Sequence, residues 1–193
     1  MREKKSITFA TGNKGKLYEA QALMPHVQLM SCSVDFAEPR SNDLETIARE
    51  KLRQARNVIS GPCFVQDSGF YIEALNGFPG SYVNFALETI GAEGILKLME
   101  GREDRRCGFR QCLAYFDGQK EHIFTSENTG TLSTAFAGED CAAQWSGLWH
   151  IYIPEGYDKT LSEFSQDELE ARRKSSKGTL MQLAAFLKVE DRT

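Results

Sequence analysis

Several signals that mark common classes of protein are missing from this 193-residue sequence. No run approaches the roughly 20 apolar residues of a membrane span, and no apolar signal-peptide region follows the first five residues. The five cysteines are odd in number and none lies at CxxC spacing, so we expect neither a structural zinc site nor a disulfide framework. These absences predict a cytoplasmic protein with reduced thiols.

An excess of positive charge is also missing. The net charge of -4 argues against a nucleic-acid polymer as the main partner. A small anionic ligand remains compatible with this charge, because it needs only a local positive pocket, usually with a metal ion. The length fits a single domain, residues 1–193, with room for two lobes.

Hydrophobic patterning predicts an α/β fold with a mixed sheet. Residues 6–10 alternate like a strand, a turn follows, and residues 16–24 have apolar side chains at helical spacing. Another helix begins near Asn42, which we expect to accept from the first free amides, with Glu45 reaching back. The other predicted elements are strands at residues 27–33, 63–65, 107–116, 122–126 and 130–133, and helices at residues 83–90, 93–99, 165–174 and 178–188.

The turn at residues 11–16, Thr-Gly-Asn-Lys-Gly-Lys, has the composition of an anion-binding loop. A strand, a glycine-bearing turn and a helix together point free amides and the positive end of the helix dipole at a ligand. Thr11 and Asn13 can donate hydrogen bonds, and Lys14 and Lys16 supply charge. The loop is neither a Walker A motif nor GxGxxG. A plain strand-turn-helix connection stays open as the alternative.

Three further residues are candidates for phosphate or metal chemistry. Lys51 lies in the apolar stripe of the helix after residue 42, which suggests either a lysine held towards a phosphate or one that snorkels to water. Asp67 follows the short strand at residues 63–65, where a carboxylate suits a metal ion or a base, or else caps a local turn. Glu38 is a possible second carboxylate.

Taken together, these motifs resemble the inosine triphosphate pyrophosphatases, also called the Ham1 or non-canonical purine NTP pyrophosphatase family. The resemblance covers nearly the whole chain in the family's order. It is carried by TxNxxK at residues 11–16, Glu38 and the helix with Lys51, Gln66-Asp67-Ser68-Gly69, ALNGFPG at residues 74–80, and IPEGYDKT at residues 153–160.

The resemblance implies an elongated α/β fold, with two lobes around a long mixed sheet and the active site in the cleft between them. Members are usually homodimers that use Mg²⁺ to release a nucleoside monophosphate and pyrophosphate from ITP, dITP or XTP. The roles implied here are catalysis by Asp67, Lys16 and Lys51, substrate binding by Thr11, Gly12, Asn13, Ser68 and the same lysines, and metal binding by Glu38 and Asp67.

The segments that would recognise the base depart from the family pattern. The family's G-[WY]-D-P is absent, and Trp149 and His150 stand where its aspartate and proline should be. Its Ser-His-Arg is also absent, and the candidates to replace it are Ser175, Ser176 and Lys177, with Lys174 in an alternative register. Trp149 could stack on a base, or it belongs to the core or a dimer interface. The usual inosine and xanthine preference is therefore left open.

Two functions compete at this stage. The retained phosphate and metal residues predict a Mg²⁺-dependent nucleoside triphosphate pyrophosphatase, acting on non-canonical purine nucleotides or a related modified nucleotide. The altered base segment suggests the alternative, a non-catalytic nucleotide-binding or regulatory protein on the same scaffold. A Maf-type pyrophosphatase is a weaker third option, because the start of the chain has TxNxxK rather than an S-x-S-x-R type motif. Gln66 replaces an acid that many bacterial members carry, which lowers the negative charge beside Asp67.

Overall fold

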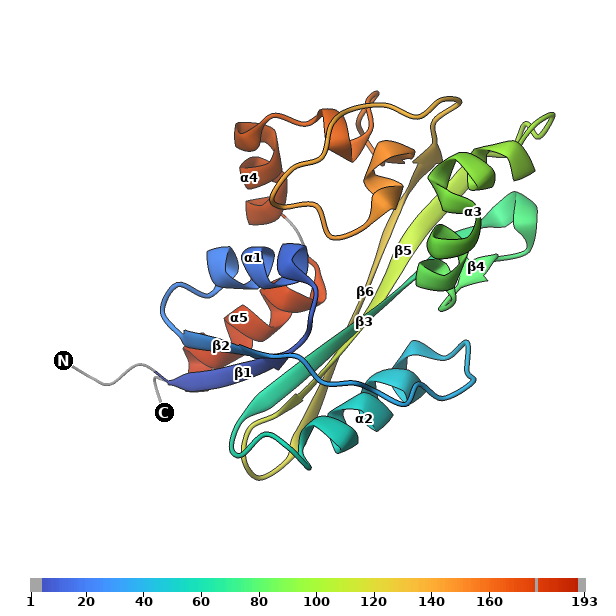
Figure 1. Cartoon of the computed structure of the whole chain (residues 1–193). Helices are drawn as coiled ribbons and strands as arrows, with labels where there is room; N and C mark the ends of the chain where they lie inside the picture. The colour runs from blue at the N-terminus through green and yellow to red at the C-terminus, as the bar shows by residue number, and fades with distance from the viewer. Residues whose placement is uncertain (1–4, 176, 191–193) are drawn as a thin grey trace. The chain divides into compact units, whose positions relative to one another are not determined.

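The computed structural model describes residues 5–175 and 177–190. It divides into two compact units, which are described separately. In its described part, unit 1 comprises residues 5–67, 111–126 and 177–190, and unit 2 comprises residues 68–110 and 127–175. Figure 1 shows the course of the chain. The predicted cleft between two lobes and the elongated shape stay predictions.

A mixed sheet confirms the predicted α/β class. Within the described residues its hydrogen-bonded order is β2-β1-β3-β5-β6-β7, with β4 paired to β3. Strand β1 is parallel to β2 and β3, whereas the β3–β4 and β6–β7 pairs are antiparallel. The strands are β1 (Ser6–Ala10), β2 (Gln28–Cys32), β3 (Cys63–Ile72), β4 (Pro79–Gly80), β5 (Arg106–Phe116), β6 (Glu121–Leu132) and β7 (Tyr152–Pro154).

Helices cover both faces of the sheet in unit 1. Successive side chains of a strand point to opposite faces. Phe64 of β3 therefore packs with α1 (Lys14–Leu23) and α5 (Thr179–Glu190), in a cluster that includes Leu183. Its neighbour Val65 packs on the other side, against Leu52 of α2 (Leu44–Ala55). Figure 1 shows α1 close to α5, and α2 apart from them. This alternation decides which helix each residue of β3 can reach.

Unit 2 has a core of its own. Phe70, Ile95, Trp149 and Tyr152 are among its buried members. The helix α3 (Val83–Leu98) is kinked at Gly91, whose φ of 67° falls in the left-handed region. This kink separates the two short helices that the sequence predicts. The other elements are α4 (Gln166–Ser175) and three 3₁₀ turns, η1 (Glu73–Leu75), η2 (Gly147–His150) and η3 (Leu161–Glu163).

Two sequence predictions about local structure are wrong. The N-cap of α2 is Asp43 rather than Asn42, because both Asp43 carboxylate oxygens accept hydrogen bonds, from the amides of Glu45 and Thr46. A charged acceptor is favoured at the positive end of a helix. Glu45 forms an ion pair with Arg49 one turn later.

The second error concerns residues 66–69 and 127–129, which the sequence does not predict as strand but which lie within β3 and β6. Strand β3 does not end near residue 65, because Phe70 and Ile72 continue it into the core of unit 2. Asp67 is thus inside a strand rather than in a turn after it. Strand β6 likewise runs unbroken from Glu121 to Leu132, since polar residues fit on its exposed positions. None of the helices in the described part of the chain is long and apolar enough to cross a membrane.

Candidate active site

The start of α1 is shaped by the side chains of the 11–16 turn. Asn13 is the N-cap, and its Oδ1 accepts a hydrogen bond from the amide of Lys16 at 2.9 Å. Thr11 Oγ1 accepts from the amide of Asn13 at 3.1 Å, which fixes the turn before the helix. The amides of Lys14 and Gly15 belong to the same first turn, where intrahelical acceptors do not exist. The turn, with the exposed Gly12 beside it, therefore presents a helix N-terminus suited to an anion.

Lys51 joins the two predicted carboxylates. Its Nζ lies 2.5 Å from Asp67 Oδ1 and 2.6 Å from Glu38 Oε1. Asp67 can make this contact because it shares the α2-facing side of β3 with Val65. The side chains of Lys51 and Asp67 are 13% and 12% exposed, whereas that of Glu38 is 60% exposed. The lysine is therefore held in the site and does not snorkel to water.

The pKa values of Lys51 and Lys16 are shifted in opposite directions. Burial lowers the pKa of Lys51, but the charges and hydrogen bonds of Asp67 and Glu38 outweigh this, so its pKa lies above the ordinary 10.5. Burial lowers the pKa of Lys16 from 10.5 to about 8; the negative charge of Asp67 opposes this shift, and the positive charge of Lys51 adds to it. Lys16 Nζ donates to the carbonyl oxygen of Gln66 at 3.1 Å. Lys16 is thus an ammonium group with a neutral partner.

The carboxylates fit a hard divalent cation such as Mg²⁺. Among the described residues, Asp67 Oδ2 and Ser68 Oγ are buried and have no hydrogen-bond partner. A buried carboxylate oxygen without a partner is costly unless a ligand completes it. No group of three His, Cys, Asp or Glu side chains in the described chain could hold a metal ion. Two carboxylates suit Mg²⁺ if phosphate and water complete its shell.

The predicted base-stacking role of Trp149 is not supported. Its side chain is 5% exposed in the core of unit 2, and its ring lies edge-on to that of Trp145, with centroids 6.2 Å apart. A ring packed in this way offers no open face to a base. His150 is also buried, with Nδ1 bonded to the carbonyl of Ala137 and Nε2 within 3.0 Å of Asp140. The core interpretation of Trp149 is therefore the one that the structure favours.

The other candidate base contacts lie around the end of α4 and the start of α5. Ser175 and Lys177 are exposed, in unit 2 and unit 1 respectively. Ser175 Oγ donates to the carbonyl of Arg172, and the carbonyl of Lys177 accepts from Gln182 Nε2. Ser176 lies outside the described residues. The roles of these three residues in substrate binding stay predictions.

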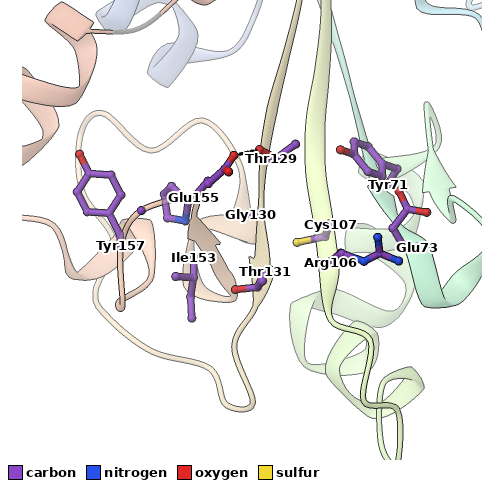
Figure 2. Close-up of a pocket in the computed structure, with 12 residues that line it drawn as sticks. Tyr71, Glu73, Arg106, Cys107, Thr129, Gly130, Thr131, Ile153, Glu155 and Tyr157 are labelled. Atoms are coloured by element: carbon purple, nitrogen blue, oxygen red, sulfur yellow. Dashed lines mark hydrogen bonds between the residues drawn. The ribbon is translucent and has the colours of Figure 1, made fainter.

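Unit 2 also contains a hollow of about 590 Å³, and residues 153–157 of the IPEGYDKT motif are part of its lining. Figure 2 shows Tyr71, Glu73 and Arg106 on one side of it and Glu155 and Tyr157 on the other. None of the predicted site residues lines it. The candidate active site therefore rests on the side-chain cluster of unit 1 and not on this hollow.

Known sequences are similar to this chain over most of its length. The profile described as the Ham1 family matches residues 7–182. A dITP/XTP pyrophosphatase of Thermococcus kodakarensis is 36% identical over 185 residues, covering 94% of this chain and 97% of that protein. The enzyme of the same name from Methanopyrus kandleri is 39% identical over 165 residues, covering 84% of this chain and 86% of its own.

Solved structures agree on the fold. The Ham1 protein of Staphylococcus aureus superposes with a TM-score of 0.78 at 24% identity, covering 96% of this chain and 100% of that protein. A HAM1 protein of Coxiella burnetii gives a TM-score of 0.75 at 21% identity, covering 95% and 98% of the two chains. At these identities the likeness concerns the arrangement of the chain alone.

Proposed function

The chain belongs to the Ham1 family, and from this premise we propose that it is a nucleoside triphosphate pyrophosphatase. It hydrolyses non-canonical purine nucleotides such as dITP, XTP and ITP to the monophosphate and pyrophosphate. The relatives named dITP/XTP pyrophosphatases support this choice of substrate. The observation that carries the proposal is the bridge from Lys51 to Asp67 and Glu38, beside Lys16 and the start of α1.

The residues of the site divide the chemistry between them. The first turn of α1 and the ammonium groups of Lys16 and Lys51 bind the triphosphate and offset its charge. Asp67 orients a water molecule for in-line attack on the α-phosphorus and accepts its proton at a carboxylate oxygen. The bond from the α-phosphorus to the bridging oxygen breaks, and pyrophosphate leaves with its charge shielded by the lysines.

We also propose that Glu38 and Asp67 hold Mg²⁺ when the substrate is bound. The buried, unpartnered Asp67 Oδ2 supports this, because oxygen ligands suit this ion. When bound, Mg²⁺ supplies positive charge to the phosphate oxygens in the transition state. Lys51 contacts Asp67 Oδ1 and Glu38 Oε1, so Asp67 Oδ2 is left for the ion.

Two finer properties remain proposals. We propose that the protein is a homodimer, which the family resemblance and the exposed apolar side chains around α3 support. We also propose a cytoplasmic location, in keeping with the five free cysteines.

The decisive experiment measures pyrophosphate release from ITP, dITP, XTP, GTP, ATP and modified-base triphosphates in the presence of Mg²⁺. We expect turnover of at least the inosine or xanthine nucleotides. In H₂¹⁸O the label should appear in the monophosphate, because water attacks the α-phosphorus. Asp67→Asn should lower kcat by about 100-fold or more, and Asp158→Asn, at an exposed aspartate outside the site, should not change it.

Folded wild-type protein that binds triphosphates but releases pyrophosphate from none of them would support the non-catalytic alternative. The complete set of Lys16, Lys51, Asp67 and Glu38 favours the enzyme, since a binding protein has less need of a residue that activates water.

A further inference from the structure

The candidate metal ligand Glu38 lies on a segment without regular secondary structure. Residues 33–43, between β2 and α2, contain no helix or strand. Such a segment has no ladder of main-chain hydrogen bonds, so a carboxylate on it needs other contacts to keep its position. Asp67 differs in this respect, because it lies inside β3. The contacts that hold the backbone at Glu38 therefore decide how the two carboxylates are placed relative to each other.

The side-chain amide of Gln54 holds the main chain one residue before Glu38. Its Oε1 accepts a hydrogen bond from the amide of Ala37 at 2.9 Å, and its Nε2 donates to the carbonyl of Ala37, also at 2.9 Å. The same Nε2 donates to Glu50 Oε1 at 3.0 Å, which fixes the orientation of the side-chain amide. Gln54 thus engages both main-chain polar groups of Ala37, as a paired residue of a neighbouring strand does.

Two other contacts anchor the same stretch of chain. The ring of Phe36 packs against the cluster of unit 1 that contains Leu52. Pro39 follows Glu38, and a residue before proline is disfavoured in the helical region. Pro39 limits the main-chain angles of Glu38 but not those of Ala37, which the two hydrogen bonds of Gln54 restrain. The orientation of the peptide that leads into Glu38 therefore depends on Gln54.

Gln54 and Lys51 lie three residues apart on α2, so they are neighbours on one face of the helix. Gln54 contacts the main chain just before Glu38, and Lys51 Nζ contacts the carboxylate of Glu38 at 2.6 Å. Lys51 Nζ also lies 2.5 Å from Asp67 Oδ1. One face of α2 therefore sets the place of Glu38 beside Asp67 at two points, the backbone and the carboxylate.

We propose that Gln54 is a positioning residue for the metal site. It holds Glu38 where its carboxylate and that of Asp67 share one divalent cation, and it acts through the main chain of Ala37. This inference rests on the proposed function and extends it to a residue outside the cluster of lysines and carboxylates.

The expected effect of losing the amide follows from its surroundings. Gln54→Met keeps the length of the side chain and removes both the donor and the acceptor. Methionine is a good helix former, so α2 should keep Lys51 in place. Ala37 is exposed, so water replaces the lost bonds and the fold is kept. The segment around Glu38 must then be ordered when the ion binds, which weakens metal binding but leaves the loaded site intact.

The test uses one measurement with turnover and one without. Gln54→Met should raise the Mg²⁺ concentration for half-maximal pyrophosphate release about fivefold, with kcat at saturating Mg²⁺ within about twofold of wild type. Mn²⁺ takes the same kind of oxygen ligands, and its binding is followed by electron paramagnetic resonance with a non-hydrolysable α,β-methylene analogue of dITP. Mn²⁺ affinity should fall by the same factor. Gln21→Met, at an exposed glutamine of α1, is the matched control and should behave like wild type.

A double-mutant cycle separates positioning of Glu38 from a general loosening of unit 1. If Gln54 acts through Glu38, adding Gln54→Met to Glu38→Ala should change the Mg²⁺ and Mn²⁺ dependence by no more than about 1.5-fold. An effect of undiminished size in the Glu38→Ala background would overturn the inference.

Three further outcomes would also overturn it. These are unchanged Mg²⁺ and Mn²⁺ dependence in Gln54→Met, a loss of kcat that saturating Mg²⁺ does not restore, and wild-type protein that binds no Mn²⁺ with the analogue. Wild-type protein that binds Mn²⁺ but releases no pyrophosphate would refute the proposed function instead, and the Mn²⁺ comparison would still test Gln54.

Discussion

At the scale of single residues, the site brings an ammonium group into direct contact with two carboxylates. Lys51 lies between Glu38 and Asp67, and the two carboxylates are the candidate metal ligands. Glu38→Gln should therefore raise the Mg²⁺ concentration for half-maximal activity by about tenfold or more, with a smaller change in the rate at saturating Mg²⁺. A Mg²⁺ titration of pyrophosphate release measures this. An identical titration curve in the variant would remove Glu38 from the metal site, and Glu139→Gln, at an exposed glutamate of unit 2, is the control.

Lys16 gives a second prediction at this scale, through its pKa of about 8 in the free protein. The triphosphate binds the charged ammonium, so kcat/KM should fall as the pH rises through about 8. Lys16→Arg should lose this fall, because arginine stays protonated. A pH profile of kcat/KM tests it, and a fall of the same size in Lys16→Arg would assign the titration to another group.

The same shift has a consequence for stability. The folded protein binds the Lys16 proton less tightly than the unfolded chain, so unfolded molecules carry more protons between pH 8 and 10.5. Stability contributed by this residue therefore rises with pH across that window. Lys16→Met should increase the free energy of unfolding at pH 7 by about 1–2 kcal/mol while reducing activity. Urea unfolding measures the first effect, and a loss of stability in this variant would contradict the buried-charge account.

At the scale of elements, α2 matters because it carries Lys51 to the face of β3 where Asp67 lies. The helix starts at Asp43, whose carboxylate accepts from two amides and from the hydroxyl of Thr46. These bonds lower the pKa of Asp43, chiefly through Thr46, so the cap is lost as the pH falls through that pKa. Asp43→Ala should lower the thermal midpoint by roughly 2–4 °C at pH 7 and leave turnover nearly unchanged at 25 °C.

The matched variant for the cap is Asn42→Ala, at the residue that the sequence pattern favours. We expect it to change the midpoint less than Asp43→Ala, because Asp43 accepts the bonds from the first amides of α2. Calorimetric scans of both variants at pH 7 and pH 3 make the comparison. Equal losses in the two variants at pH 7 would show that the cap is shared.

At the scale of the whole molecule, the apolar surface of unit 2 predicts self-association. Phe78, Tyr82, Phe85, Ile90 and Leu98 are exposed large apolar residues at or near α3, and Phe85 is 67% exposed. Exposed apolar groups of this kind mark protein interfaces. Phe85→Lys should shift a dimer to monomer in sedimentation velocity, whereas Val58→Lys, at a residue with 66% exposure in unit 1, should not. A wild-type protein that sediments as a monomer at micromolar concentration would refute the dimer.

The sequence by itself determined the local structure around residues 11–16, the predicted phosphate end of the site. Residues 11–16 are contiguous, so the succession of strand, turn and helix follows from local rules that a linear pattern contains. The structure added that the helix begins at Lys14 and that Asn13 is its N-cap. The α/β class and the pair of helices at residues 83–99 are likewise local or periodic features. The roles of Lys51, Asp67 and Glu38 came from the resemblance, because no local pattern distinguishes a site lysine from one that snorkels.

Only the tertiary structure decided which distant side chains meet. It showed that Asp67 lies within the strand β3 and not after its end. Asp67 therefore faces Lys51 of α2, while Gln66 faces Thr179 of α5. It also placed Trp149 in a core rather than beside a ligand. The physical reason is that neighbouring residues of a strand point to opposite faces of the sheet. Which helix covers each face depends on packing between segments that are distant in the sequence.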